Sequence, residues 1–162
     1  MLKIRTARKE DATAIININI NSWRETYKGI FPDIFLNSLS ENIEESINKC
    51  KNNISEYIVA TIDNRVVGFC RIGKNKKGYP SNYAEIYALY INEDYKDQKI
   101  GTSLVKYSFS ILSDKYDFCL ISSLKENSAN DFYKKINGNF IGICKFNVMD
   151  NSYIENIYEF KI

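Results

Sequence analysis

The sequence has no histidine, only two prolines and seven glycines, and four cysteines spread along its 162 residues. Without histidine the usual zinc sites are excluded, and no CxxC pair is present. Cys50, Cys70, Cys119 and Cys144 are therefore interpreted as buried free thiols, which fits a reducing compartment. We expect no metal in the functional site.

Charge of one sign and long apolar runs are also missing. Twenty-two Lys and Arg residues against twenty Asp and Glu residues give a formal net charge of +2, which argues against a nucleic-acid partner. The N-terminal stretch MLKIRTARKEDA has no apolar signal core, and no stretch approaches the roughly 18 to 20 apolar residues of a membrane span. These absences predict a cytoplasmic protein with no membrane partner.

The chain does contain enough apolar sequence for one core. With 44% hydrophobic residues, a chain of this length predicts a single domain over residues 1–162. Alternating or continuous apolar runs predict strands, and apolar spacing of three and four predicts helices. The expected strands cover residues 2–7, 56–62, 65–72, 83–91, 117–124, 140–146 and 152–160, with turns at 63–64 and around 149–151.

The stretch IINININ (residues 15–21) fits two patterns. Its isoleucines alternate with asparagine as in a strand, whereas a longer window from Ala12 to Tyr27 keeps helical spacing. We predict a helix, with Glu10 and Asp11 in its first turn, where carboxylates favour the helix dipole.

A break at Gly29 and Pro32 ends this helix, after which an apolar series beginning at Leu36 predicts a second helical segment to about Cys50. Later helices are expected over residues 100–113 and 128–136. The resulting order is β-α-α-β-β-β-α-β-α-β-β. The fold class is therefore mixed α/β, with the later helices crossing between strands.

One connection between a strand and a helix is chemically distinctive, the loop EDYKDQKIGT (residues 93–102). The first N–H groups of the following helix lack internal partners and can bind an anion. Lys96 and Lys99 add positive charge, Gln98 adds an amide, and Gly101 lets a phosphate approach the backbone. The residues fit a pyrophosphate cradle, and they also fit a solvated connection whose glycine packs against a neighbouring element.

Together with the strand before it, this loop resembles the acetyl-coenzyme A binding motif of the GNAT family, the GCN5-related N-acetyltransferases. The family motif reads Gln/Arg-x-x-Gly-x-Gly/Ala between the fourth strand and the third helix. Lys96 takes the Gln/Arg position, Lys99 the first Gly position and Gly101 the Gly/Ala position. Two of the three signature residues therefore differ from the family pattern.

Three further stretches extend the resemblance over nearly the whole chain. IRTARKEDATAI resembles the family's opening strand and helix, and SWRETYKGIFPDIFLNSLS resembles the first two helices of one bacterial branch. ENSANDFYKKINGNFIG is similar to Asn-x-x-Ala-x-x-x-Phe-Tyr-x-x-x-Gly-Phe, with Phe132 and Tyr133 in place and Asn127 one residue closer to Ala129 than usual. The resemblance implies a mixed, mostly antiparallel twisted sheet of about seven strands flanked by about four helices, with strands four and five splayed.

The resemblance also implies how acetyl-CoA, the acetyl donor, is bound. In the family the pantetheine arm pairs with the fourth strand as an extra strand would, and that strand end is here Leu89, Tyr90 and Ile91. The amide near Leu89 would polarise the thioester carbonyl. The other cofactor-binding residues implied are Lys96, Gln98, Lys99, Ile100, Gly101, Thr102, Asn127 and Tyr133.

Two residues are implied for proton transfer. Tyr133 stands at the family's tyrosine position and would donate a proton to the departing thiolate, while a core aromatic is the alternative interpretation. Glu85 lies in a strand among apolar neighbours and would accept the proton of the amine through a water chain. A solvated glutamate at a strand edge is the alternative for Glu85.

The residues next to the KGIFPD break resemble the family's variable acceptor wall. Trp23, Glu25 and Tyr27 are the residues implied there, and Glu25 would attract a cationic amine; for Trp23 a core position is the alternative. Tyr87 joins them because it shares the strand face of Glu85. The acceptor is expected to be a small-molecule or peptide amine, and the closing hairpin has enough strand-forming aromatics for a homodimer edge.

The sequence thus predicts an N-acetyltransferase that moves the acetyl group of acetyl-CoA to a primary amine by direct attack in a ternary complex. A non-catalytic acyl-CoA-binding sensor or regulatory module of the same fold is the alternative. A dinucleotide-binding domain is disfavoured, because no GxGxxG follows a first strand.

Overall fold

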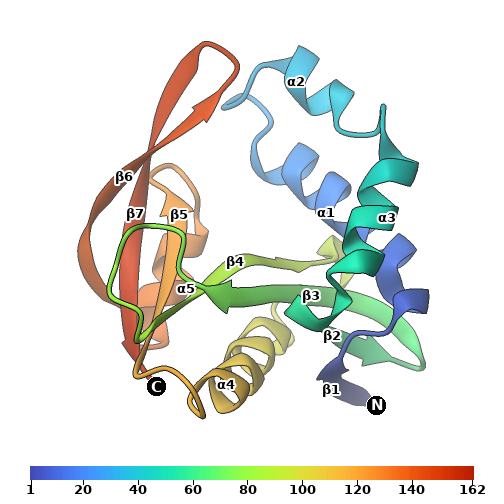
Figure 1. Ribbon diagram of the computed structural model, residues 1–162. Coiled ribbons are helices and arrows are strands. Elements are labelled where there is room, and N and C mark those ends of the chain that lie inside the picture. Colours follow the sequence, from blue (N-terminus) through green and yellow to red (C-terminus); the bar gives the residue numbers. More distant parts are fainter. The chain divides into compact units, whose positions relative to one another are not determined.

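The computed structural model describes residues 1–162 (Figure 1). Its strands are β1 (Leu2–Thr6), β2 (Tyr57–Ile62), β3 (Arg65–Lys74), β4 (Tyr83–Ile91), β5 (Phe118–Leu124), β6 (Asn139–Val148) and β7 (Asn151–Lys161). Its α-helices are α1 (Ala12–Thr26), α2 (Asp33–Ser38), α3 (Ile43–Asn52), α4 (Ile100–Leu112) and α5 (Ala129–Lys135). Three short 3-10 helices are η1 (Lys9–Asp11), η2 (Ile54–Glu56) and η3 (Glu93–Tyr95).

The seven strands form one mixed sheet in the order β1-β2-β3-β4-β5-β7-β6. β4 and β5 pair in parallel, whereas β1 with β2, β2 with β3, β5 with β7 and β6 with β7 pair antiparallel. Parallel neighbours need a long crossover connection, which α4 supplies between β4 and β5. The expected mixed, mostly antiparallel sheet is confirmed.

The chain forms two compact units, each of which is described by itself. Unit 1 comprises Met1–Ile72 and Ala88–Ser108, and unit 2 comprises Gly73–Tyr87 and Phe109–Ile162. The chain passes from one unit to the other within β3, β4 and α4. A single domain over residues 1–162 stays a prediction.

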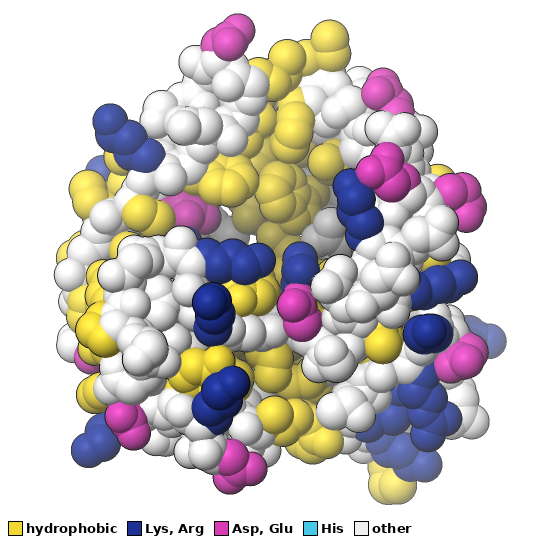
Figure 2. Space-filling model, in the orientation of Figure 1, with side chains coloured by type: hydrophobic (Ala, Val, Ile, Leu, Met, Phe, Trp, Pro, Cys, Tyr) yellow, Lys and Arg dark blue, Asp and Glu magenta, His cyan; other side chains and the backbone are white.

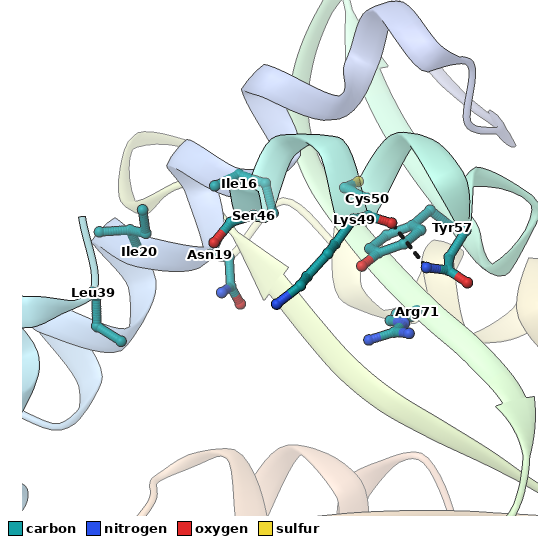
Figure 3. Close-up of a pocket in the computed structure, with 10 residues that line it drawn as sticks. Ile16, Asn19, Ile20, Leu39, Ser46, Lys49, Cys50, Tyr57 and Arg71 are labelled. Atoms are coloured by element: carbon teal, nitrogen blue, oxygen red, sulfur yellow. Dashed lines mark hydrogen bonds between the residues drawn. The ribbon is translucent and has the colours of Figure 1, made fainter. Parts of the chain in front are cut away.

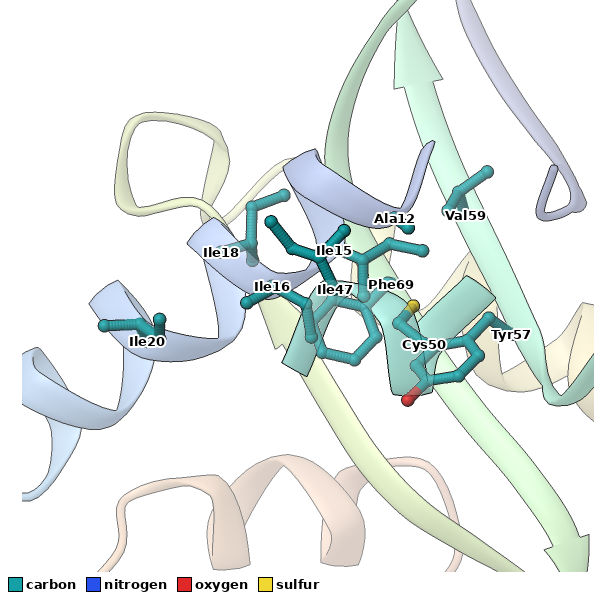
Figure 4. Packing of buried hydrophobic residues seen from close by; sticks show 10 residues of the cluster. All are labelled: Ala12, Ile15, Ile16, Ile18, Ile20, Ile47, Cys50, Tyr57, Val59 and Phe69. Carbon is teal, nitrogen blue, oxygen red and sulfur yellow. The ribbon is translucent and has the colours of Figure 1, made fainter. Parts of the chain in front are cut away.

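In unit 1, α1 and α3 cover one face of β2 and β3 (Figure 1). Side chains from all four elements meet in the core that Figure 4 shows, among them Ile15, Ile47, Val59 and Phe69. All four isoleucines of IINININ are buried and lie in α1. The helical interpretation of that stretch is therefore confirmed, because a helix can bury this broad apolar surface against both the sheet and α3.

The opposite face of β3 meets α4. Neighbouring residues of a strand point to opposite faces, so Cys70 faces away from the core around Phe69. Ser108 of α4 donates a hydrogen bond to the Cys70 Sγ over 3.4 Å. Burial raises the pKa of the Cys70 thiol to about 12, which keeps it a thiol at neutral pH. None of the four cysteines is in a disulfide.

The second helical segment differs from the prediction, because it consists of two helices separated by Leu39–Asn42. Arg24 of α1 explains the break. Its Nε donates to the carbonyl of Leu36 over 3.1 Å, and its Nη2 lies 3.3 Å from the carbonyl of Asn37 and 2.9 Å from Ser40 Oγ. Carbonyls at a helix end need such donors, so Arg24 stabilises the end of α2 instead of a continuous helix.

In unit 2, β6 and β7 form a long hairpin (Figure 1), and β7 also pairs with β5. One face of these strands is covered by helix residues. The Tyr133 ring of α5 lies 5.7 Å from that of Tyr158, and the Phe109 ring of α4 lies 5.2 Å from that of Phe160. Tyr158 and Phe160 have the same strand parity, so both helices use one face.

The charged side chains carry no dominant sign. On the face drawn in Figure 2, lysine and arginine side chains stand among aspartate and glutamate side chains, in keeping with the 22 basic and 20 acidic residues. No helix has both the length and the apolar character that crossing a membrane requires.

Candidate functional site

The loop between β4 and α4 contains two residues with left-handed backbone conformations. Asp97 and Lys99 adopt left-handed conformations, with φ of 62° and 60°. Glycine adopts this conformation without steric cost, whereas other residues pay for it. Lys99 stands where the motif quoted above has glycine, and it takes the backbone conformation that favours glycine.

Helix α4 begins directly after this turn. Its bond from the Ser103 N–H to the Lys99 carbonyl, 3.1 Å long, closes the first turn. The N–H groups of Ile100, Gly101 and Thr102 belong to this turn and have no intrahelical acceptor. Ile100 and Gly101 are buried, and Ile100 anchors the helix start, while Gln98 and Lys99 are exposed.

A charged cluster lies at the other end of the same loop. Lys96 forms an ion pair with Glu93, and both side chains are exposed. The hydrogen bond from Lys96 is the main cause that holds the pKa of Glu93 below its usual range, and Glu25 of α1 adds a further hydrogen bond. The structure thus brings Glu25, predicted for the acceptor side, to Glu93, the ion-pair partner of Lys96.

The end of β4 is held close to β3. The N–H of Asn92 donates to the Val67 carbonyl over 2.8 Å. A Cβ on Gly68 would lie 3.0 Å from the Tyr90 carbonyl oxygen and 3.2 Å from an Ile91 side-chain carbon. Glycine at 68 therefore permits the close approach that places the strand end. Leu89, Tyr90 and Ile91 are all half-buried there.

Trp23 and Tyr27 lie in an aromatic cluster that joins α1 to α2. Their ring centroids are 5.1 Å apart, and the Tyr27 ring lies 4.5 Å from that of Phe31. Phe35 extends the cluster, at 6.1 Å from Trp23. Tyr27 is buried and Trp23 half-buried, so both stabilise the helical corner, and Trp23 also keeps part of its surface exposed.

Unit 1 also contains a pocket of about 380 Å³, shown in Figure 3. In Figure 3 the polar ends of Asn19, Lys49 and Arg71 are directed toward the same space from α1, α3 and β3. The residues that line it are Ile16, Asn19, Ile20, Leu39, Ser46, Lys49, Cys50, Asn53, Tyr57 and Arg71. The two charged residues in this lining, Lys49 and Arg71, are both cationic.

The guanidinium of Arg71 is oriented by its neighbours. Its Nε lies 2.8 Å and its Nη2 2.7 Å from Oε2 of Glu56, and its Cζ lies 5.4 Å from the ring centroid of Tyr57. Burial is the main cause that raises the pKa of Tyr57 to about 12, so its hydroxyl stays protonated. Tyr57 also hydrogen-bonds Cys50, which closes the floor of the pocket.

Glu85, the predicted base, is a buried member of an ion pair in unit 2. Its side chain is 7% exposed, and its Oε1 lies 3.1 Å from Lys77 Nζ. Its Oε2 accepts a hydrogen bond from the Lys76 N–H over 2.8 Å. Burial alone would lower the pKa of Lys77, but the charge and hydrogen bond of Glu85 raise it above its usual range. The interpretation of Glu85 as a solvated edge residue is excluded by this burial.

The loop that carries Lys77 is ordered by Asn75. Its Nδ2 donates to the carbonyls of Tyr79, Pro80 and Tyr83, and its Oδ1 accepts from the N–H groups of Lys77 and Tyr79 over 3.3 Å and 3.0 Å. Tyr87 adds to the same loop. Its hydroxyl donates to the carbonyl of Lys74, and Lys76 Nζ lies 4.1 Å from its ring centroid. Loop and strand therefore hold Lys77 against Glu85.

Tyr133 and Asn127 are positioned at α5 in unit 2. Tyr133 is 6% exposed and packs against Phe132 and Tyr158, with centroid distances of 5.4 Å and 5.7 Å. Asn127 Oδ1 accepts from the Ala129 N–H over 2.9 Å. Asn127, predicted to bind the cofactor, thus has a local role in starting α5.

Asn130 in α5 was not among the predicted site residues. It is 7% exposed, donates to the carbonyls of Leu124 and Asn127 over 2.8 Å and 2.7 Å, and accepts from the Tyr158 hydroxyl over 2.8 Å. A lone amide in a helix pattern gives little sequence signal. Arg71 does give one, since it is a charged residue between the buried residues Cys70 and Ile72 of β3, but its relation to the pocket depends on α1 and α3.

Comparison with known proteins identifies the family. The model of the Acetyltransferase (GNAT) family matches residues 20–138. The chain is 28% identical over 137 residues to the uncharacterized N-acetyltransferase YuaI of Bacillus subtilis, covering 83% of this chain and 78% of YuaI. It is 26% identical over 143 residues to a spermidine N(1)-acetyltransferase of Thermoplasma acidophilum, covering 83% of this chain and 86% of that protein.

Solved structures agree with this assignment of the fold. The PaiA N-acetyltransferase of Thermoplasma acidophilum, crystallised in complex with coenzyme A, has a TM-score of 0.75 at 24% identity and covers 100% of this chain and 99% of its own. An N-acetyltransferase of Staphylococcus aureus has a TM-score of 0.75 at 20% identity, with coverage of 99% and 98%. The chain belongs to the GNAT family and is an N-acetyltransferase.

Proposed function

We propose that this N-acetyltransferase transfers the acetyl group of acetyl-CoA to a primary amine by direct attack in a ternary complex. The observation that supports the proposal is the turn at Asp97 and Lys99, after which α4 begins within the stretch that resembles the family's cofactor motif and leaves three first-turn N–H groups without an intrahelical acceptor. Such N–H groups bind phosphates without needing any particular side chain. The loop could therefore bind the pyrophosphate although Lys96 and Lys99 differ from the residues of the motif.

Most of the residues proposed to hold acetyl-CoA lie in unit 1, whereas Asn127 and Tyr133, also proposed to bind it, lie in unit 2. The backbone of Leu89, Tyr90 and Ile91 would pair with the pantetheine arm, and the loop amides from Gln98 to Thr102 would hold the pyrophosphate. Lys96 would exchange Glu93 for a phosphate oxygen, because its ion pair is exposed and weakly held. Acetyl-CoA supplies an acetyl thioester, whose carbonyl the amide near Leu89 would polarise.

Two residues of unit 2 are proposed for the proton transfers. As the amine nitrogen bonds to the carbonyl carbon, the bond from carbon to sulfur breaks and the nitrogen must lose a proton. Glu85 would accept that proton through water, and Tyr133 would give its phenolic proton to the departing sulfur. Proton loss and gain then balance. Asn127 is proposed to assist the cofactor only indirectly, since its side chain begins α5.

The acceptor is proposed to be a small-molecule or peptide amine. The name of the Thermoplasma acidophilum relative, a spermidine acetyltransferase, supports an amine as the acceptor class. Trp23, Glu25 and Tyr27 in unit 1 and Tyr87 in unit 2 are the proposed acceptor contacts, and the partly exposed Trp23 ring favours such a role.

We also propose a homodimer formed through the closing hairpin. β6 is the last strand of the sheet, and it exposes Phe140 and Ile143, at 54% and 60%. An edge strand with apolar side chains pairs readily with another strand. Light scattering of the wild type and of an Ile143→Lys variant tests this, since the charged edge should give a monomer.

The activity is tested by mixing the protein with acetyl-CoA and a panel of amines and measuring the release of free thiol. Thiol release is expected with at least one amine, and Tyr133→Phe should lower kcat by about tenfold to a hundredfold. CoA itself should raise the melting temperature by mass action.

The alternative is a module of the same fold that binds acyl-CoA without turnover. A rise in melting temperature with CoA, no thiol release across the panel and no effect of Tyr133→Phe would favour that module. Absence of any thermal shift with CoA would contradict both proposals.

A further inference from the structure

The pocket of unit 1 has a charge pattern that indicates its ligand. Its two charged lining residues are Lys49 and Arg71, and no carboxylate is part of the lining. The volume of about 380 Å³ falls within the range of roughly 300–1,000 Å³ usual for small-molecule sites. We propose that this pocket holds the carboxylate and the side chain of the acceptor, a part of the site that Trp23, Glu25, Tyr27 and Tyr87 do not line, and that the acceptor is an amino acid with an apolar side chain.

Arg71 is the residue best placed to bind the carboxylate. Glu56 contacts its Nε and Nη2 through one oxygen, Oε2, at 2.8 Å and 2.7 Å, and the ring of Tyr57 lies against it. These contacts fix the direction of the guanidinium, so it loses little side-chain freedom when a ligand binds. Arginine also matches the planar shape of a carboxylate better than lysine does.

The remaining walls fit the rest of such a molecule. Ile16, Ile20 and Leu39 supply an apolar side for an aliphatic side chain. Asn19 and Ser46 add an amide and a hydroxyl, both half-buried. Apolar residues beside polar and charged ones can orient one small ligand that has an apolar part and a polar part.

Arg71 also lies beside the proposed site of the thioester. β3 and β4 are antiparallel neighbours, with Gly68 next to Tyr90 and Ile91. Arg71 comes three residues after Gly68 in β3. Because the strands run in opposite directions, Arg71 lies alongside Ala88 and Leu89 of β4. A carboxylate held by Arg71 would leave the amine of a small amino acid within reach of the Leu89 amide, all within unit 1.

The same charges disfavour a polycation. Lys49 and Arg71 already pair with Glu45 and Glu56, and no carboxylate lines the pocket to receive the second cation of a polyamine. The acceptor therefore differs in charge from the spermidine in the name of the Thermoplasma acidophilum relative. This inference rests on the proposed function for its catalytic consequence, although binding of the carboxylate tests it separately.

The first experiment measures kcat/KM for leucine, leucinamide and spermidine, using thiol release from acetyl-CoA. We expect kcat/KM to be higher for leucine than for spermidine. The ratio of kcat/KM for leucine to kcat/KM for leucinamide should fall at least about tenfold in Arg71→Gln. Because each ratio is compared between variant and wild type, the different amine basicities of leucine and leucinamide cancel. Lys49→Gln should lower the ratio about twofold to fivefold, since an exposed charge contributes less.

Lys51→Gln is the matched control, because Lys51 lies on the same helix but does not line the pocket. It should leave the ratio unchanged. If Arg71→Gln lowers the melting temperature, the exposed Lys49→Gln variant carries the test in a folded protein. An unchanged ratio in both variants, or a preference for spermidine in the wild type, would overturn the inference and leave the proposed function intact.

The second experiment separates the two proposals by calorimetric titration without acetyl-CoA. The probes are N-acetylleucine and N-acetylleucinamide, which differ only in the carboxylate. We expect the acid to bind at least about tenfold more tightly, and this preference to be lost in Arg71→Gln. If it binds in this way while no amine releases thiol, the pocket is confirmed and the transferase proposal fails. Equal or undetectable binding of the two probes overturns the inference.

Discussion

Lys77 Nζ lies 3.1 Å from Oε1 of Glu85, and the two side chains are only 21% and 7% exposed. The pair attaches the loop after β3 to the middle of β4. It also means that the proposed base of the reaction already has a cation beside it. An ion pair so shielded from solvent costs free energy when one partner is removed, because the other is left without its counter-charge.

We expect Glu85→Gln to lower the free energy of unfolding by about 1–3 kcal/mol, as measured by urea denaturation. A double-mutant cycle with Lys77→Gln should give a coupling free energy of at least about 0.5 kcal/mol. Lys76→Gln is the control, because the contact of Lys76 with Glu85 is made by its backbone. A coupling near zero for Lys77 and Glu85 would show that the pair does not hold the loop.

Lys99 has the left-handed backbone that glycine adopts most easily, with φ of 60°. Replacing it by glycine relieves steric cost but adds entropy to the unfolded chain, so Lys99→Gly should raise the stability by about 0.5–1 kcal/mol. Lys106→Gly, in the interior of α4, should instead lower it by about 1 kcal/mol. Thermal unfolding of both variants checks this. Since the cradle is proposed to use backbone N–H groups, CoA should still raise the melting temperature of Lys99→Gly.

Asn130 joins α5 to β7 through the hydroxyl of Tyr158 and the amide of Asn156, at 2.8 Å and 3.1 Å. Asn130→Ala removes the partner of several buried groups at once and should lower the free energy of unfolding by about 2–4 kcal/mol. Tyr158→Phe removes one hydrogen bond and keeps the ring, so about 0.5–1.5 kcal/mol is expected. The exposed neighbour Asp131 serves as the control, with less than about 0.5 kcal/mol for Asp131→Ala. Equal losses for Asn130→Ala and Asp131→Ala would contradict the role assigned to the amide.

Asp11 should make the protein sensitive to acid. Burial would raise the pKa of its carboxyl, but hydrogen bonds from Arg5, at 2.7 Å and 3.0 Å, and from the Arg8 N–H, at 2.7 Å, together with the charge of Arg5, lower it below its usual range. The folded pKa is thus lower than the unfolded pKa of about 4. The stabilisation is fully present above the unfolded pKa and is lost as the pH falls through the folded one.

Asp11→Asn should therefore reduce the stability at neutral pH and flatten its dependence on pH below about pH 4. Urea denaturation of the variant and the wild type at pH 7 and at pH 3 tests this. The two proteins should differ less at the lower pH. A difference that stays constant between the two pH values would show that ionisation of Asp11 does not contribute.

Local patterns in the sequence were sufficient for most of the secondary structure. The strands from residue 56 to residue 91 and the closing hairpin follow alternating apolar residues, whose burial in a sheet needs no knowledge of distant partners. The second helical segment is different. The spacing of Leu36 to Ile47 continues through residues 39–42, and the break there depends on Arg24, which is distant in sequence and reaches the carbonyls of α2 only in the folded chain.

By itself the sequence determined the order of the strands and the family, and it predicts the loop from Glu93 to Thr102 as a place for a phosphate, because a helix start is a local feature. Only the tertiary structure decided what surrounds the reactive groups. It gave Lys99 its left-handed backbone, placed Lys77 against Glu85, and gathered Lys49 and Arg71 at one pocket. The pocket in particular depends on side chains from α1, α3 and β3, and no spacing along the sequence encodes the distances between them.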